Sequence, residues 1–212
     1  MSAEQKLKEL PSYSEELGLN LREPEGRFKW FLASILFGKR ISAEIAKRTF
    51  AKFESAGITT SEKILEAGWD KLVEILDSGG YTRYDFSTAS KLLNISRLLE
   101  KKYGSLEKLY ASAENNKDLE KRFLEFKGIG PTTVNIFLRE LRPIWEKADP
   151  KVSSPALDVV KKIKLEENRK IKFLESSLVR VNLEYCKSKR CQGCPVRKSC
   201  SEFKNDNNRF EP

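Results

Sequence analysis

The sequence predicts an all-α protein built from many short helices. Apolar residues recur at spacings of three and four along most of the chain, and few segments show the strict alternation of a half-buried strand. Glycines end several of these stretches, and Ser or Thr residues stand where helices would begin. With 39% hydrophobic and 10% aromatic residues among 212, the chain can bury the core of one large domain or of two small ones.

The periodic segments can be assigned in order. The first clear helix carries Phe28, Phe31 and Ile35, and Ser42 is positioned to cap the helix that follows. Gly57 ends that second helix, and the pair Gly79-Gly80 ends the apolar pattern that begins at Ser61. The expected helices span residues 26–37, 42–56, 61–78, 86–103, 106–111, 118–126, 132–141, 155–163 and 171–183, and residues 206–212 are expected to form a flexible polar tail.

Charge and composition limit the classes of function. The net charge is +9, which favours a polyanionic partner such as nucleic acid, although a Lys-rich solvated surface would give the same balance. Histidine is absent, so imidazole cannot act as a general base or a metal ligand. No apolar run approaches the roughly 18 residues of a membrane span, and the N-terminus lacks an apolar signal segment. We therefore expect a protein that stays inside the cell.

A glycine-rich segment between two predicted helices has the features of an anion-binding hairpin. Gly128 and Gly130 flank Ile129, which allows a tight turn with positive φ values, and Pro131 suits the first position of a helix. The backbone N–H groups of the turn and of the helix start, including that of Thr133, would then point at one anion. Ile129 would anchor the turn. An ordinary helix–helix turn remains the alternative interpretation.

Four cysteines lie within 15 residues near the C-terminus, at Cys186, Cys191, Cys194 and Cys200. Clustered thiols in an intracellular protein indicate metal binding rather than a disulfide scaffold. Five Lys and Arg residues and no acid lie among them, which suits an anionic centre. Irregular spacing favours an iron–sulfur cluster, and zinc held by four thiolates is the main alternative.

The hairpin Lys-Gly-Ile-Gly-Pro-Thr-Thr, followed about fifty residues later by this cysteine pattern, resembles the endonuclease III family of base-excision DNA glycosylases. The resemblance covers nearly the whole chain, from the Phe28 helix to Cys200. It implies a six-helix domain with a helix-hairpin-helix over residues 24–136. A second helical domain, residues 1–23 and 137–205, would hold a [4Fe–4S] cluster on the four cysteines.

Two departures from the family pattern bear on the chemistry. Members that also cleave the DNA strand have a lysine just after the hairpin that forms a Schiff base with the sugar, and Thr132 stands at the matching position. A hydroxyl cannot form an imine, so lyase activity by that route is expected to be absent. The first cysteine interval is also shorter than is usual in the family, which should alter a loop without removing a ligand.

The resemblance also implies a catalytic aspartate and several DNA contacts. Asp149 is the natural candidate, where a carboxylate would stabilise a positively charged sugar or activate water. Alternatively, Asp149 is a plain helix N-cap, or the helix that starts at Ser154-Pro155 is the equivalent one and Ser154 takes the place of the aspartate. Asp158 is a weaker candidate. Further contacts are expected from a side-chain wedge of Tyr81, Arg83 and Tyr84, which could instead be loop packing, and from Lys39 on the opposite strand.

The sequence therefore predicts a monofunctional DNA glycosylase that hydrolyses the N-glycosidic bond of a damaged or mismatched base in double-stranded DNA. The alternatives are a DNA-damage or DNA-structure binding protein that has lost its chemistry on the same scaffold, and a zinc-stabilised helical protein with another partner. We expect a cytoplasmic, nucleoid-associated monomer.

Overall fold

The structure is a computed structural model that describes residues 1–166 and 170–203, and all regular elements within these ranges are helical. The all-α fold class is confirmed. The expected tail, residues 206–212, lies outside the described residues. The α-helices are α1 (Ala3–Glu9), α2 (Tyr13–Glu16), α3 (Pro24–Phe37), α4 (Ala43–Ser55), α5 (Ser61–Ser78), α6 (Asp85–Lys102), α7 (Leu106–Ser112), α8 (Asn116–Leu124), α9 (Pro131–Leu141), α10 (Ser154–Lys162) and α11 (Lys170–Arg180). A π-helical stretch, η1 (Val181–Cys186), and two short 3₁₀ turns, η2 (Cys191–Gly193) and η3 (Arg197–Ser199), follow α11.

Helix starts follow the capping residues of the sequence. Ser42 caps α4 by accepting a hydrogen bond from the Ile45 N–H, as expected. Helix α5 begins at Ser61, also as expected, and Thr60 is its N-cap. Helix α5 runs through a kink at Gly68, where φ is +72°. The helix α1 was not expected, although Ser2 and Gln5 form a reciprocal capping box at its start.

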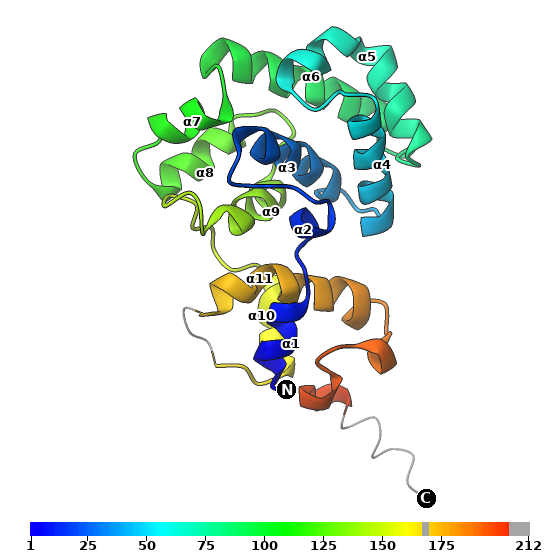
Figure 1. Ribbon diagram of the computed structural model, residues 1–212, viewed down its shortest axis with the longest axis vertical. Coiled ribbons are helices and arrows are strands. Elements are labelled where there is room, and N and C mark those ends of the chain that lie inside the picture. The colour runs from blue at the N-terminus through cyan, green and yellow to red at the C-terminus, as the bar shows by residue number, and fades with distance from the viewer. Residues whose placement is uncertain (167–169, 204–212) are drawn as a thin grey trace, which may run out of the picture. The chain divides into compact units, whose positions relative to one another are not determined.

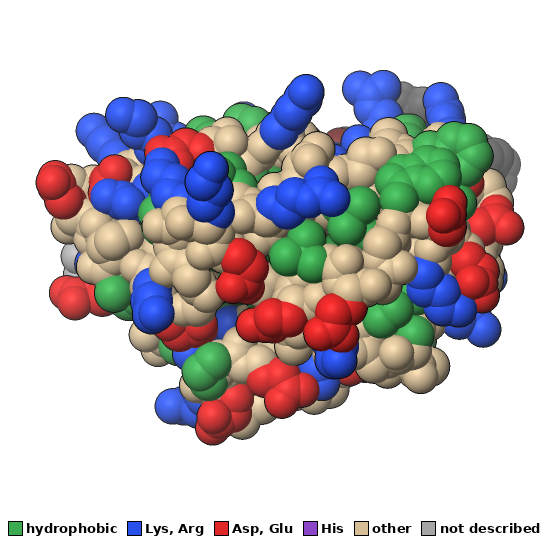
Figure 2. Space-filling model, turned by 90° about the horizontal axis from the view of Figure 1, so that it is seen from above, with side chains coloured by type: hydrophobic (Ala, Val, Ile, Leu, Met, Phe, Trp, Pro, Cys, Tyr) green, Lys and Arg blue, Asp and Glu red, His purple; other side chains and the backbone are tan. Residues whose placement is uncertain are grey.

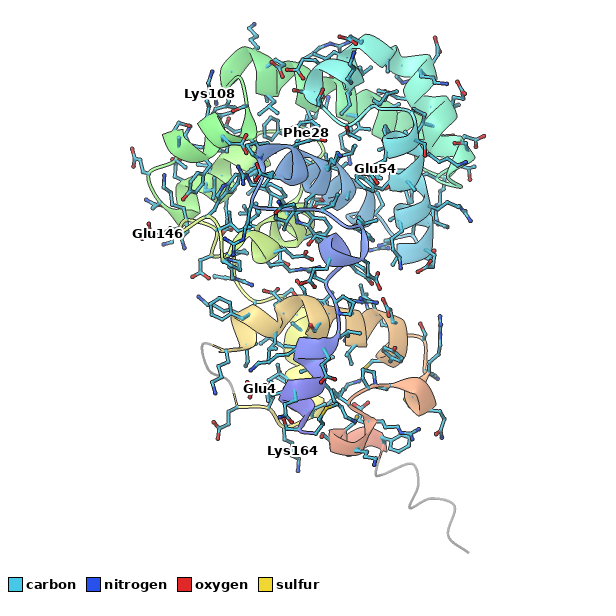
Figure 3. All side chains as sticks on the ribbon, in the orientation of Figure 1. Glu4, Phe28, Glu54, Lys108, Glu146 and Lys164 are labelled. Carbon is cyan, nitrogen blue, oxygen red and sulfur yellow. The ribbon has the colours of Figure 1, made fainter. Side chains whose placement is uncertain are left out.

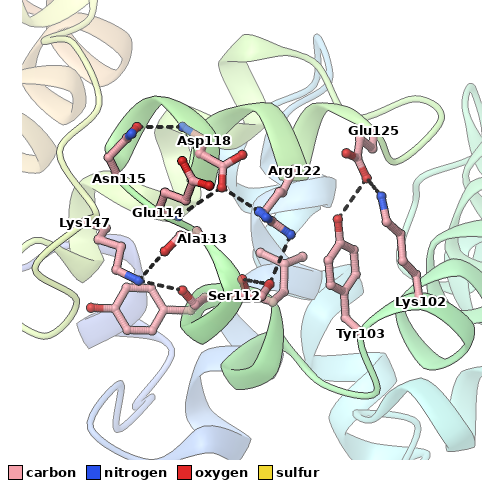
Figure 4. Close-up of polar contacts among 12 residues, drawn as sticks. Lys102, Tyr103, Ser112, Ala113, Glu114, Asn115, Asp118, Arg122, Glu125 and Lys147 are labelled. Atoms are coloured by element: carbon pink, nitrogen blue, oxygen red, sulfur yellow. Dashed lines mark hydrogen bonds and ion pairs between the residues drawn. The ribbon is translucent and has the colours of Figure 1, made fainter.

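The chain divides into two compact units. Unit 1 combines residues 1–16 with the chain from residue 151 onward, and unit 2 comprises residues 17–150. These boundaries differ from the expected ones at 24 and 136 for two reasons. The buried Arg27 guanidinium donates to the Leu21 and Arg22 carbonyls, which holds the segment before α3 against that helix. The segment after α9 is held to α7, because the Lys147 ammonium donates to the carbonyls of Tyr110 and Ala113 (Figure 4).

Helix α3 is the centre of unit 2, with α4 on one side of it and α7 and α8 on the other (Figure 1). Its Phe31 ring contacts Phe123 of α8, Phe126 of the hairpin and Phe137 of α9, with centroid distances of 5.1–6.1 Å. All four rings are buried. The Trp30 indole N–H donates to the Phe137 carbonyl (3.2 Å), which adds a polar contact between α3 and α9. This aromatic cluster fixes α8 and α9, the two helices of the hairpin, on one helix.

Polar contacts also order the connection between α7 and α8 (Figure 4). The Asn115 side chain caps α8 by accepting from the Asp118 N–H. The Asp118 carboxylate accepts from Arg122 one turn later (2.9 Å), and the Arg122 guanidinium also donates to the Ser112 hydroxyl of α7 (3.1 Å). Helix α8, which leads into the hairpin, is thereby fixed at its start as well as along its buried face.

Unit 1 has a separate aliphatic core formed by α1, α10, α11 and η1, and side chains fill the space among these helices (Figure 3). The N-terminal segment joins this core through polar contacts as well. The Tyr13 hydroxyl donates to Glu184 (3.0 Å), and the Arg180 guanidinium lies over the Tyr13 ring at 5.0 Å. Within the described ranges, no helix combines the length and apolar character needed to cross a membrane.

Candidate functional site

The glycine-rich segment of unit 2 forms a hairpin between α8 and α9. Gly128 has a φ of +90°, in the left-handed region that favours glycine. Ile129 is buried, and its N–H donates to the Phe126 carbonyl (2.9 Å). Gly130 is the N-cap of α9 in an extended conformation, and Pro131 occupies the first helical position. The hairpin therefore has the backbone features expected from its sequence, and Ile129 anchors it.

The start of α9 presents backbone donors to the outside. The first backbone bond of the helix joins the Val134 N–H to the Gly130 carbonyl (3.1 Å). In the described chain the N–H groups of Gly130, Thr132 and Thr133 have no acceptor, which is usual at a helix N-terminus. Thr132 is exposed, but the Thr133 side chain is buried against the end of α3 at Gly38. Thr133 can therefore offer an anion its backbone N–H and not its hydroxyl.

Two basic side chains lie together on the ring of Tyr84. Lys39 follows α3, and its ammonium lies 5.3 Å from the centroid of the Tyr84 ring. The Arg83 guanidinium lies 5.5 Å from the same ring and is exposed. The structure thus brings together three of the predicted DNA contacts, Lys39, Arg83 and Tyr84. Figure 2 shows many Lys and Arg side chains along the upper margin of the face, with some Asp and Glu side chains among them at the upper left and further Lys and Arg side chains in the lower half.

Tyr81 is not available as a wedge, which corrects the expectation from the sequence. Its side chain is only 1% exposed, and its hydroxyl donates to the Leu36 carbonyl (2.8 Å). The cause is local: Gly80 has a φ of +87° and turns the chain, so that Tyr81 faces the core while Arg83 stays outside. Burial raises the pKa of the Tyr81 hydroxyl, as it does for a phenol removed from water.

Asp149 lies at the end of unit 2, after a short bend. Its carboxylate pairs with the buried Arg142 guanidinium (3.5 Å), and 40% of its side chain is exposed. Arg142 also donates to the Pro150 carbonyl (2.7 Å), so the bend is held on both sides of the carboxylate. Asp149 does not cap a helix. That alternative interpretation is wrong, because the N-cap of α10 is Ser153, four residues later.

The start of α10 carries two serines and is bonded to a buried acid of α11. Ser154 is the first residue of the helix, and the Ser153 N–H donates to the Glu175 carboxylate of α11 (2.9 Å). Glu175 is fully buried, and one of its carboxyl oxygens accepts the Ser153 N–H at the start of α10. The sequence did not single out Glu175, since nothing local marks a residue that acts across two helices. Asp158 is exposed on α10, as expected for a solvated helix residue.

The four cysteines lie on successive tight turns of unit 1. Cys186 ends η1, Cys191 begins η2, Cys194 follows it, and Cys200 follows η3. Three of them pack against the unit 1 core, and Cys191 is exposed. Burial, together with the charges of neighbouring thiols, raises the pKa of the Cys186 and Cys194 thiols. Lys6 of α1 fixes the loop by donating to the Pro195 carbonyl (2.9 Å).

The four cysteine thiols have the chemistry to ligate a metal centre. Their side chains are not arranged around a single point. Four thiols and several cations are present, and no thiol is used in a disulfide. As the side chains stand, however, no three Cys, Asp or Glu residues of the described ranges are grouped closely enough to hold one metal ion. The thiols would have to converge when a metal binds.

Comparison with known proteins shows the fold. No family of known proteins matches the sequence, and neither does any curated protein. Among solved structures, the crystal structure of the H. pylori 3-methyladenine DNA glycosylase bound to 1,N6-ethenoadenine is similar, with a TM-score of 0.51 and 17% sequence identity. The match covers 89% of this chain and 99% of that chain. The chain therefore shares the overall helical fold of that structure.

The buried position of Tyr81 and the exposed position of Arg83 predict different effects of substitution. We expect Tyr81→Phe to lower the free energy of unfolding by about 1 kcal/mol, because a buried hydrogen bond is lost, and to leave duplex affinity within about twofold. Arg83→Ala should leave stability unchanged and weaken binding by about fivefold. Urea unfolding and fluorescence anisotropy with a labelled duplex measure the two effects. Weaker binding by Tyr81→Phe at unchanged stability would contradict this placement.

Proposed function

We propose that the protein is a base-excision DNA glycosylase, a hydrolase that removes a damaged or mismatched base from double-stranded DNA. The observation that supports the proposal most is a glycine-rich hairpin with backbone N–H groups at the start of α9 that are unbonded among the described residues, in a chain whose fold is similar to that of a DNA glycosylase. Contacts of this kind bind the phosphate backbone and position the protein without reading sequence. The proposed role places the protein, as a monomer, at chromosomal DNA in the cytoplasm.

The proposed chemistry is hydrolysis without a Schiff base at Thr132, the position where lyase members of the resembled family have a lysine. Thr132 cannot form an imine with the sugar. Asp149 is the proposed carboxylate, since it is partly exposed and is held by Arg142 and the bend around Pro150. A negative charge there would stabilise the positive charge that develops on the sugar as the base leaves, or would activate the attacking water.

A second candidate is a DNA-binding protein without excision activity on the same scaffold. Two observations favour it: α10 begins with serines rather than an acid, and Asp149 is already engaged by a guanidinium. Such a protein would keep the hairpin and its basic surroundings, so it would bind duplexes as well as an active enzyme does.

An excision assay distinguishes the two candidates. Duplexes that carry single lesions, 3-methyladenine and 1,N6-ethenoadenine among them, are incubated with the protein, and released base is measured by mass spectrometry. We expect base release, and a loss of at least about 100-fold in rate for Asp149→Asn because a charged catalytic group is removed. The matched control Asp158→Asn, an exposed acid nearby in sequence, should retain the native rate. Tight duplex binding with no release from any substrate would establish the second candidate instead.

We also propose that the four cysteines hold a [4Fe–4S] cluster, with zinc as the alternative. Such a cluster would supply a structural crosslink that organises the basic loop, which contains Lys187, Arg190 and Lys198. The support is the donor set itself and its anchoring on α1 and the unit 1 core.

Metal analysis tests the cluster directly. Protein purified without oxygen should be brown, contain about four iron atoms and equivalent sulfide per chain, and absorb visible light. Cys194→Ser should lose most of the iron, whereas Ser199→Ala in the same loop should keep it. A colourless protein that carries one zinc ion would contradict the iron–sulfur cluster and support the zinc site instead. A protein that carries no metal would contradict both.

A further inference from the structure

Two aromatic side chains of unit 2 lie against each other at its surface. The ring centroids of Trp69 on α5 and Phe86 on α6 are 5.3 Å apart, and the two residues are 39% and 61% exposed. Within residues 17–150, all of which the structure describes, every other aromatic residue is buried or half-buried. Because covering apolar area is favourable, two adjacent exposed rings indicate a surface for a partner rather than a part of the core.

The positions of both rings are fixed by the helices that carry them. Gly68 has a φ of +72°, which interrupts the helical geometry of α5 directly before Trp69. The Trp69 indole N–H donates to the Ser90 hydroxyl of α6 (3.0 Å), and that hydroxyl donates to the Phe86 carbonyl (2.9 Å). One serine therefore joins the two aromatic residues. A surface that is held in this way loses little conformational entropy when a partner covers it.

Two acidic residues stand next to these rings in the chain and have no basic partner. The exposed Asp70 follows Trp69, and Asp85 precedes Phe86, whose N–H donates to the Asp85 carboxylate (2.6 Å). Within residues 17–150, neither aspartate pairs with a Lys or Arg, whereas two glutamates of α5 pair with lysines. In Figure 2, acidic side chains lie directly beside the hydrophobic patch at the right of the face, the side on which Figure 1 has α5. Trp69, Phe86, Asp70 and Asp85 thus form an acidic aromatic patch on a chain whose net charge is +9.

The sign of this charge selects the occupant. A phosphate backbone would be repelled by two carboxylates at close range, so the acidic aromatic patch does not suit DNA. An arginine suits it, because a guanidinium stacks on aromatic rings and forms bidentate bonds with carboxylates. Apolar side chains beside that arginine would cover the remaining ring surface. Aromatic residues and arginine are also the side chains that contribute most at protein–protein interfaces.

We propose that the acidic aromatic patch is a docking site for a different protein, which contributes a segment that carries an arginine next to an apolar side chain. A second copy of this chain that docked through the same patch would place carboxylates against carboxylates, which is unfavourable. The partner is therefore basic where it meets the rings. This role goes beyond DNA binding and base excision, and it depends on neither.

Peptide selection on the full-length protein tests the proposal. Random short peptides displayed on phage are selected in the presence of saturating duplex DNA, which occupies the proposed DNA-binding surface, and the affinities of the selected peptides are then measured. We expect sequences that combine arginine with an apolar residue. Their binding should change the indole fluorescence, because Trp69 is exposed whereas the other two tryptophans, Trp30 and Trp145, are buried.

Substitutions in the patch should weaken peptide binding without affecting the fold. Phe86→Ser should lower the affinity of the selected peptides at least about tenfold, because one of the two rings is lost. Asp70→Asn should lower it about threefold, because one of the two charges is lost. The matched control Leu124→Ser, which removes an exposed apolar side chain of α8, should bind the peptides as the native protein does. All three variants should keep the native duplex affinity and the native midpoint of thermal unfolding.

Four results would overturn the proposal. The first is that no peptide is selected, and the second is that the selected peptides lack arginine or bind Phe86→Ser as tightly as the native protein. The third is weaker duplex binding by Phe86→Ser at an unchanged unfolding midpoint, which would assign the rings to the bases of DNA. The fourth is a dimer of the native protein that Phe86→Ser dissociates, which would assign the rings to a second copy of the chain.

Discussion

The packing of both hairpin helices on Phe31 is the interaction on which the remaining features depend. Phe126 precedes the hairpin and Phe137 follows it, and both rings contact Phe31. Because these contacts are buried, the backbone between them has little freedom, and Ile129 fixes the turn itself. The donors at the start of α9 are therefore held in fixed positions, as the proposed phosphate contact requires. A preformed site of this kind loses little conformational entropy on binding.

Some basic side chains of unit 2 have no carboxylate partner among the contacts described, in contrast to the lysines of this unit that form ion pairs. Most lysines of unit 2 that carry a defined contact have a carboxylate partner, as Lys71 has in Glu74. Lys39 and Arg83 instead contact the face of the Tyr84 ring, among the contacts described. These cations are held by packing rather than neutralised, so their charge remains for a ligand. Under the proposed function, the hairpin and these cations would bind the anionic sugar–phosphate chain of DNA.

Local signals in the sequence were sufficient to predict most helices and the hairpin turn. Apolar periodicity and caps such as Ser42 located most helices within a few residues, and the two glycines around Ile129 predicted the turn. Contacts between distant segments were not predictable in this way. Nothing near Tyr81 shows that Gly80 turns it inward, and nothing near Lys91 shows that its stem rests on Gly128. The boundary after residue 150 likewise depends on Lys147 reaching α7. Such features are set by tertiary packing, which a single sequence does not display.

Gly130 allows the most direct test of the claim that the hairpin holds DNA. A Cβ at this N-cap would meet no atom within 4 Å, and the φ of −111° is open to any residue. Gly130→Val should therefore fold normally, yet place a branched side chain where a phosphate would approach the donors of α9. The measurement is duplex affinity by fluorescence anisotropy at fixed salt, together with the midpoint of thermal unfolding. The account predicts at least about tenfold weaker binding at a nearly unchanged midpoint. Equal affinity of the native and Gly130→Val proteins would contradict it.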